Sequence, residues 1–163
     1  MEIKRLKEAQ MGLFNKKFSI EVMPKTAQKV RDFSEILPSK TLVYIAHLED
    51  TDISDMKQTC IRLIDEGMIP MPHIPARILK SSSELEEWVS QYANVGVKRC
   101  LLLAGNNKTP KGSFHSSIQL LETGFFEKYG YEYINVAGHP EGNPDIDKSQ
   151  LWKIQNQQAK LAL

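Results

Sequence analysis

The chain has 163 residues, of which 41% are hydrophobic and 25% are charged, and this length and composition are typical of a single globular domain. Its formal net charge of +1 argues against binding to nucleic acid or to an acidic membrane surface, which requires a marked basic excess. No run approaches the ~20 apolar residues of a membrane span, and the charged start, residues 1–8, lacks the apolar stretch of a signal peptide.

Two cysteines, Cys60 and Cys100, stand far apart in the sequence, with no CxxC spacing and no third ligand type beside either. This isolation favours buried free thiols over a disulfide or a metal site. We therefore expect a cytoplasmic protein.

Five apolar, strand-like runs follow one another along the chain, and each ends near a polar residue that chemistry could use. The runs cover residues 18–24, 42–47, 68–73, 97–106 and 131–137, the last leading into 138–144. A helical pattern follows each run, so the alternation predicts one α/β domain over residues 1–163, with 1–15 as a lead-in, built on a parallel sheet with right-handed crossovers. The polar residues would then gather at the C-terminal edge of the sheet, where open α/β sheets and (β/α)8 barrels build their sites.

Between these runs, apolar residues recur every three or four positions, which is the spacing of amphipathic helices. The predicted helices cover residues 27–37, 53–64, 83–92, 118–125 and a last one starting at Asp147. Ser83 and Glu86 have the spacing of a capping box. Glycines at 67, 96 and 130 are placed to end three of the helices.

The length limits how much of a barrel this chain can form. A complete (β/α)8 barrel takes about 250 residues, whereas five βα units fit 163 residues. The sequence therefore predicts either an open sheet or a TIM barrel of which only the first five units are present, and residues 155–163 read as a helix cut before its next strand. An incomplete barrel exposes a strand edge, so we expect a homo-oligomer or association through that edge.

The most informative single residue is Glu21, because Val22-Met23-Pro24 follow it at once. An apolar setting raises the pKa of a carboxylic acid, which suits a general acid near neutral pH. The alternative is a buried ion pair with Lys25 or Arg77.

Two histidines, His47 and His73, fall at the ends of successive strand-like runs. Either one alone suits a structural hydrogen bond, whereas two in register suggest a site. Without a third ligand at a matching position the pair is weak support for zinc, so no metal is expected.

Two loops carry further candidates. Gly105 and Asn106 follow the fourth run, where glycine allows a close approach of the backbone to a ligand or simply forms a turn, and residues 106–113 form a candidate active-site loop. Residues 138–144 combine two prolines, two glycines and three polar side chains, which favours function over mere connection. Neither G-x-G-x-x-G nor G-x-x-x-x-G-K-[ST] occurs, so Rossmann and P-loop nucleotide binding have no support.

Four of these segments, taken in order, resemble the methylenetetrahydrofolate reductase family of (β/α)8-barrel flavoproteins. Residues 18–24 (FSIEVMP) stand for the family's F-S-x-E-F-F-P-P, and residues 72–76 (PHIPA) for P-H-x-x-C. Residues 103–106 (LAGN) match L-R-G-D loosely, and residues 137–144 (AGHPEGNP) are close to A-x-Y-P-E-x-H-P. The resemblance covers the first five of the family's eight strands.

The resemblance implies a function. NAD(P)H would reduce bound FAD, and the flavin would then reduce 5,10-methylenetetrahydrofolate to 5-methyltetrahydrofolate, a step of one-carbon and methionine metabolism. Glu21 matches the family's general acid. The residues that match positions lining the FAD, or lie beside them, are Ala46, His47, His73, Leu103, Ala104, Gly105, Asn106, His139 and Asn143.

Several of these positions depart from the family pattern. Asn106 replaces an aspartate that faces the flavin, Ala104 an arginine, His139 a tyrosine and Asn143 a histidine. The family's T-Q-x-x-F segment on the sixth strand would lie beyond Leu163. These departures motivate an alternative function, a folate- or flavin-binding homologue or subunit that has lost the reductase activity.

Overall fold

The structure, a computed structural model, describes residues 18–137. Its strands are β1 (Ser19–Val22), β2 (Leu42–Ile45), β3 (Ile69–Pro75), β4 (Arg99–Leu103) and β5 (Tyr133–Val136). Its α-helices are α2 (Pro24–Ala27), α3 (Ile53–Asp65), α4 (Ser82–Asn94), α5 (Ser117–Leu121) and α6 (Phe125–Lys128), and two 3₁₀ turns are η1 (Phe33–Glu35) and η2 (Ala76–Ile78).

The described strands form one five-stranded sheet in the order β1-β2-β3-β4-β5, and every neighbouring pair is parallel. The predicted parallel α/β sheet is therefore confirmed. Strand order follows chain order without reversal, which is consistent with part of a barrel-type α/β fold.

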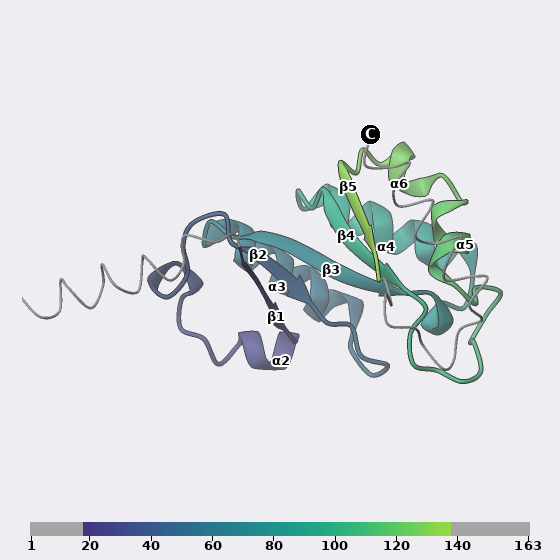
Figure 1. The fold of residues 1–163 in the computed structure, drawn as a ribbon, viewed down its shortest axis with the longest axis horizontal. Coiled ribbons are helices and arrows are strands. Elements are labelled where there is room, and N and C mark those ends of the chain that lie inside the picture. The colour runs from purple at the N-terminus through teal and green to yellow at the C-terminus, as the bar shows by residue number, and fades with distance from the viewer. Residues whose placement is uncertain (1–17, 138–163) are drawn as a thin grey trace, which may run out of the picture.

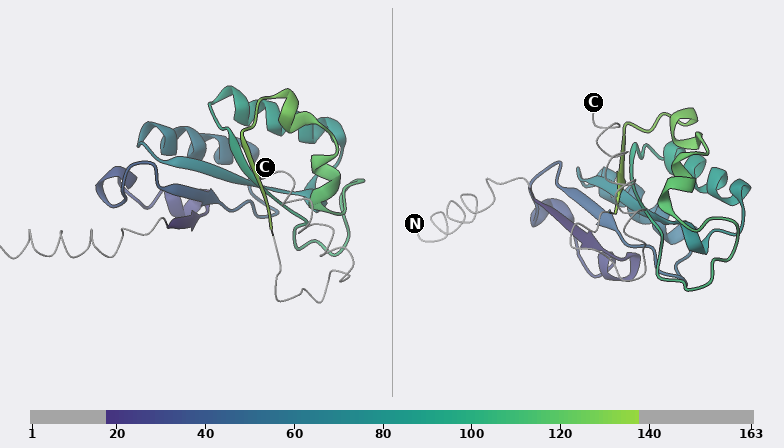
Figure 2. Two further views of the ribbon diagram at one scale, coloured as in Figure 1. Left: turned by 45° about the horizontal axis from the view of Figure 1, so that its top comes forward. Right: turned by 45° about the vertical axis from the view of Figure 1, so that its right-hand side comes forward.

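Helices α3, α4, α5 and α6 lie on one side of this sheet (Figures 1 and 2). The core fills the space between the two layers, with fully buried Val43 and Ile45 from β2 and Cys100 and Leu102 from β4 facing helix residues such as Leu85. Because side chains alternate across a strand, the residues between these core positions face the other side of the sheet. That second face carries the candidate site.

The sheet is curled, as a contact between two strands that are not neighbours demonstrates. Asn135 Nδ2 on β5 lies 3.1 Å from Tyr44 Oη on β2, although β3 and β4 stand between them. Three strand spacings of about 4.8 Å separate such strands in a flat sheet, and side chains standing perpendicular to it would not meet. The face with Tyr44 and Asn135 is therefore concave. In Figure 2, β5 runs at a steep angle to β2 and β3.

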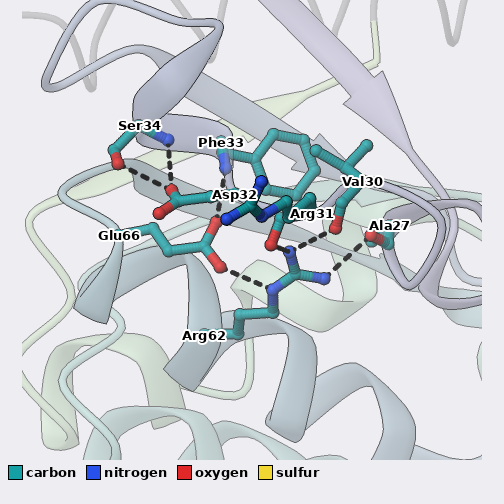
Figure 3. A network of polar contacts seen from close by, with 8 residues as sticks. All are labelled: Ala27, Val30, Arg31, Asp32, Phe33, Ser34, Arg62 and Glu66. Atoms are coloured by element: carbon teal, nitrogen blue, oxygen red, sulfur yellow. Dashed lines mark hydrogen bonds and ion pairs between the residues drawn. The ribbon is translucent and has the colours of Figure 1, made fainter.

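The predicted helix over residues 27–37 is wrong, because α2 has one turn and η1 follows after a bend. Figure 3 shows the reason: the Arg62 guanidinium of α3 donates hydrogen bonds to the carbonyl oxygens of Ala27, Val30 and Arg31 in this segment. Glu66, paired with Arg62 at 2.6 Å, accepts the Phe33 N–H at 2.7 Å. These contacts fix an irregular chain, rather than a helix, on α3.

Two other helices begin or break where the sequence was ambiguous. The cap of α4 is Ser81, whose hydroxyl accepts from the Glu84 N–H, and not Ser83 with Glu86 as predicted. Glu86 instead pairs with Lys128 of α6. The predicted helix over 118–125 is divided into α5 and α6 by Gly124, whose φ of +72° interrupts a right-handed helix.

The two cysteines are buried free thiols, as predicted. Among residues 18–137, no helix is long and apolar enough to cross a membrane. The predicted helix from Asp147 lies outside the described residues.

Candidate functional site

The concave face gathers four polar or polarisable side chains at its centre: Glu21 on β1, Tyr44 on β2, His73 on β3 and Asn135 on β5. Strand register places Glu21 beside Tyr44 and Tyr44 beside Met71. It also places His73 level with Leu101 of β4, which is level with Asn135. Four strands therefore each contribute a polar group to one face.

One contact in this group joins Glu21 and His73, whose Oε2 and Nε2 atoms are 3.5 Å apart. The distance allows an ionic contact, but His73 Nε2 makes no hydrogen bond with the described residues, although the atom is buried. Burial lowers the pKa of His73, and the Glu21 carboxylate offsets part of this effect. The imidazole is therefore neutral near pH 7, and its Nε2 can exchange a proton with Glu21 or bind a ligand atom.

The setting of Glu21 differs from the expectation. Its side chain is 61% exposed, because Glu21 alternates with Ile20 and Val22 and so points to the concave face rather than into the core. It forms no buried ion pair with Arg77, whose guanidinium donates to the carbonyls of His115 and Asn107. The carboxylate is accessible to a ligand on this face.

Tyr44 and Asn135 were not singled out from the sequence. Tyr44 meets His73 edge-on, with ring centroids 6.1 Å apart, and Asn135 Nδ2 lies 3.1 Å from Tyr44 Oη and 3.5 Å from Met71 Sδ. A signal was available, since Tyr44 stands between Val43 and Ile45, and Asn135 between Ile134 and Val136. A polar group between two core residues of a strand marks the opposite face.

His47 does not join this group. It lies beyond β2 and stacks on Trp88 of α4, with centroids 4.7 Å apart and planes 17° apart. Burial lowers the pKa of His47 to about 4, an effect that the Thr51 main chain and the Asp52 carboxylate partly oppose, and His73 adds to it. The two histidines thus occupy separate environments.

His47 lines a pocket of about 300 Å³ beside the βα loops. The lining combines apolar Ile53, Ile78 and Trp88 with His47, Thr51, Glu49, Asp52, Lys80, Glu84 and Lys111. Lys111 Nζ, from the loop after β4, lies 2.9 Å from Glu49 Oε1. The carboxylates and ammonium groups around this pocket make it polar.

The end of β4 holds four predicted cofactor-lining residues. Leu103 is the last strand residue and is half-buried. The Ala104 carbonyl accepts a hydrogen bond from the Arg77 N–H at 2.9 Å. Gly105 has a φ of +88°, and a Cβ there would lie 3.1 Å from Pro75 Cβ, so this glycine serves a close backbone approach. Asn106 is exposed.

The remaining predicted positions are less informative. Ala46 is half-buried, and its N–H donates to the Val22 carbonyl at 2.8 Å. His139 and Asn143 lie outside the described residues. Within residues 18–137, no three His, Cys, Asp or Glu side chains come together as metal ligands.

A scan of the sequence against known protein-family models finds no match.

Proposed function

We propose that the protein is an FAD-dependent oxidoreductase of the (β/α)8-barrel type that uses NAD(P)H to reduce 5,10-methylenetetrahydrofolate to 5-methyltetrahydrofolate. The observation that carries this proposal is the Glu21–His73 pair on the concave face. The carboxyl group of Glu21 is accessible to a ligand there, 3.5 Å from a buried imidazole whose pKa is lowered by burial. The resemblance of the segments around Glu21 and His73 to the methylenetetrahydrofolate reductases supplies the reaction.

One residue on this face fits a bound flavin. His73 Nε2 is buried without a hydrogen-bond partner among residues 18–137, and such an atom is costly unless a ligand or water satisfies it. Bound FAD would supply the electron transfer, which no protein side chain provides.

Glu21 would supply the proton for the substrate. Opening the imidazolidine ring of methylenetetrahydrofolate requires protonation of a ring nitrogen, and a carboxyl group within hydrogen-bond reach performs this step. His73 Nε2 lies 3.5 Å from Glu21 Oε2 and would help to hold the carboxyl group in place, while solvent would return a proton to Glu21 between turnovers, because its side chain is 61% exposed. The curled sheet places both groups on one face, away from the helices.

The experiment is spectroscopic and kinetic. The purified protein is expected to show flavin absorbance, or to bind added FAD, and to catalyse NAD(P)H–menadione reduction. A colourless protein without affinity for FAD would refute the proposal. Glu21→Gln is expected to lower folate turnover by about 10²–10⁴-fold while flavin reduction persists, and Glu132→Gln, which removes an exposed carboxylate outside the site, is the matched control.

The same experiment addresses a second candidate function, a folate- or flavin-binding homologue without turnover. Asn106 favours it, because an amide is exposed where the resembled family has a carboxylate. Such a protein would bind FAD or folate, and Glu21→Gln would have no turnover to remove.

A further inference from the structure

The neighbours of the Asn135 side chain determine which way its hydrogen bond with Tyr44 runs. An amide nitrogen donates and an amide oxygen accepts, and the two are exchanged if the side chain is flipped. Met71 Sδ lies 3.5 Å from Asn135 Nδ2, and a thioether sulfur can only accept. The amide orientation that satisfies both neighbours therefore turns the NH₂ group toward Met71 and Tyr44.

This orientation makes Tyr44 Oη the acceptor of the Asn135 N–H at 3.1 Å. A phenol has one proton to donate, and Asn135 Nδ2 cannot receive it. No other hydrogen bond of the Tyr44 hydroxyl is present among residues 18–137. The hydrogen bond that Tyr44 Oη accepts from Asn135 thus holds the hydroxyl in place. The Tyr44 O–H is still able to donate a hydrogen bond to another partner.

The surroundings of Tyr44 restrict where that partner can lie. The Tyr44 ring meets His73 edge-on, and in the sheet register Tyr44 is beside Glu21. A ligand atom that accepts a hydrogen bond from the Tyr44 hydroxyl therefore lies on the concave face, on which Glu21 is the neighbouring residue of β1. Tyr44 is half-buried rather than enclosed, so the hydroxyl is open to a ligand.

We propose that Tyr44 donates a hydrogen bond to an acceptor atom on the heteroaromatic ring of the substrate that Glu21 protonates, and that Asn135 is the residue positioning the Tyr44 hydroxyl. The assignment rests on the proposed function for the identity of that ring, a reduced pterin, whose carbonyl oxygen and ring nitrogens are acceptors. Tyr44 selects a substrate with an acceptor at this position. Loss of a donor to such a group is costly, since the ligand atom is left unpaired in the complex.

The test measures the dissociation constant for 5-methyltetrahydrofolate, by tryptophan fluorescence or calorimetry, for the intact chain and its variants. Tyr44→Phe removes only the hydroxyl and is expected to weaken binding about tenfold, as for the loss of one hydrogen bond. Asn135→Asp replaces the donor with an acceptor, so the carboxylate accepts the hydrogen bond of the Tyr44 hydroxyl and binding weakens to a similar extent. Tyr133→Phe, on the same strand as Asn135 and half-exposed, is the matched control and should bind as the wild type does.

The double variant separates positioning from a general effect on the sheet. If Asn135 acts through Tyr44, Tyr44→Phe combined with Asn135→Asp binds no more weakly than Tyr44→Phe alone. Additive losses, or unchanged binding by Tyr44→Phe, would overturn the assignment, as would a folded wild type that binds no folate. Menadione reduction is measured in parallel: folate binding that depends on Tyr44 without any flavin activity would reject the reductase function and retain this inference.

Discussion

The burial of His47 makes a quantitative prediction about stability and pH. In the folded protein the His47 side chain is 7% exposed and stacked on Trp88, and its pKa is lowered from 6.5 to about 4, chiefly by desolvation. The unfolded chain therefore binds a proton at His47 between about pH 6.5 and pH 4, whereas the folded protein does not. Stability is then present above pH 6.5 and is lost as the pH falls toward 4.

The size of this effect follows from the two pKa values. At about 1.4 kcal/mol for each pKa unit, His47 lowers the free energy of unfolding by about 3 kcal/mol between pH 7 and pH 4. That is a large part of the stability of a typical domain. His73 acts in the same direction, because burial also lowers its pKa.

The assay is urea denaturation followed by tryptophan fluorescence and circular dichroism at pH 7, 5.5 and 4. His47→Phe keeps a ring against Trp88 and removes the titrating group. Between pH 7 and pH 4, the free energy of unfolding of this variant should therefore fall by about 3 kcal/mol less than that of the wild type. His115→Phe removes an exposed histidine and is the control for the loss of one imidazole. Equal pH dependence of the wild type and His47→Phe would refute the burial of a neutral imidazole at this position.

Three further outcomes are expected. Arg62→Met removes the hydrogen bonds to three carbonyls and the pair with Glu66. Because the Arg62 side chain is only 29% exposed, we expect urea denaturation to show about 2–3 kcal/mol of destabilisation. A change below about 0.5 kcal/mol would contradict a stabilising role of these Arg62 contacts. Gly112→Ala would bring a Cβ to 2.3 Å from the Lys80 carbonyl oxygen, so the loop after β4 must shift, and a melting temperature equal to that of the wild type would show that the loop is not fixed there. Cys60 and Cys100 are fully buried, and burial raises the pKa of both thiols, so Ellman's reagent should modify neither in the folded protein and both in urea, and rapid labelling without urea would contradict their burial.

The sequence predicted the elements whose signals are local. Residues 53–64 carry a helical repeat ending before Gly67, and the structure has α3 over Ile53–Asp65 with Gly67 at a φ of +77°. The segment at 27–37 carries a similar repeat, yet it does not form a helix. Its carbonyls bind Arg62, which lies some thirty residues away, and an apolar repeat contains no information about such a partner.

The N-cap of α4 lies two residues before the predicted Ser83, for a different reason. Three serines in succession, residues 81–83, precede Glu84 and Glu86, so two capping boxes of equal spacing compete. The structure uses Ser81 and Glu84, because Glu84 also accepts the Lys80 N–H at 2.6 Å. Glu86 is thereby free to pair with Lys128, a tertiary contact that the sequence does not show.

The separation of the two histidines shows which part of the site could be read from the chain. Val43 and Ile45 are core residues, so the period of two predicts that His47 continues on the helix side and Tyr44 on the other. The structure agrees, since His47 stacks on Trp88 and Tyr44 reaches Asn135. Strand parity alone could therefore have excluded His47 from the group around Glu21.

The same reasoning fails for His73, and the failure has a physical cause. Residues 69–75 read IPMPHIP, and from Pro70 to Pro75 every side chain is buried, so no alternation marks which face His73 occupies. A central strand of a parallel sheet is buried on both faces and loses the period of two. Its parity is fixed only by the register with β2, in which Tyr44 is level with Met71. Curvature then adds Asn135 from β5, and this step requires all five strands together. The carboxylate on this face is thus a local property of β1, whereas the imidazole, phenol and amide come together only through the register and curl of the sheet.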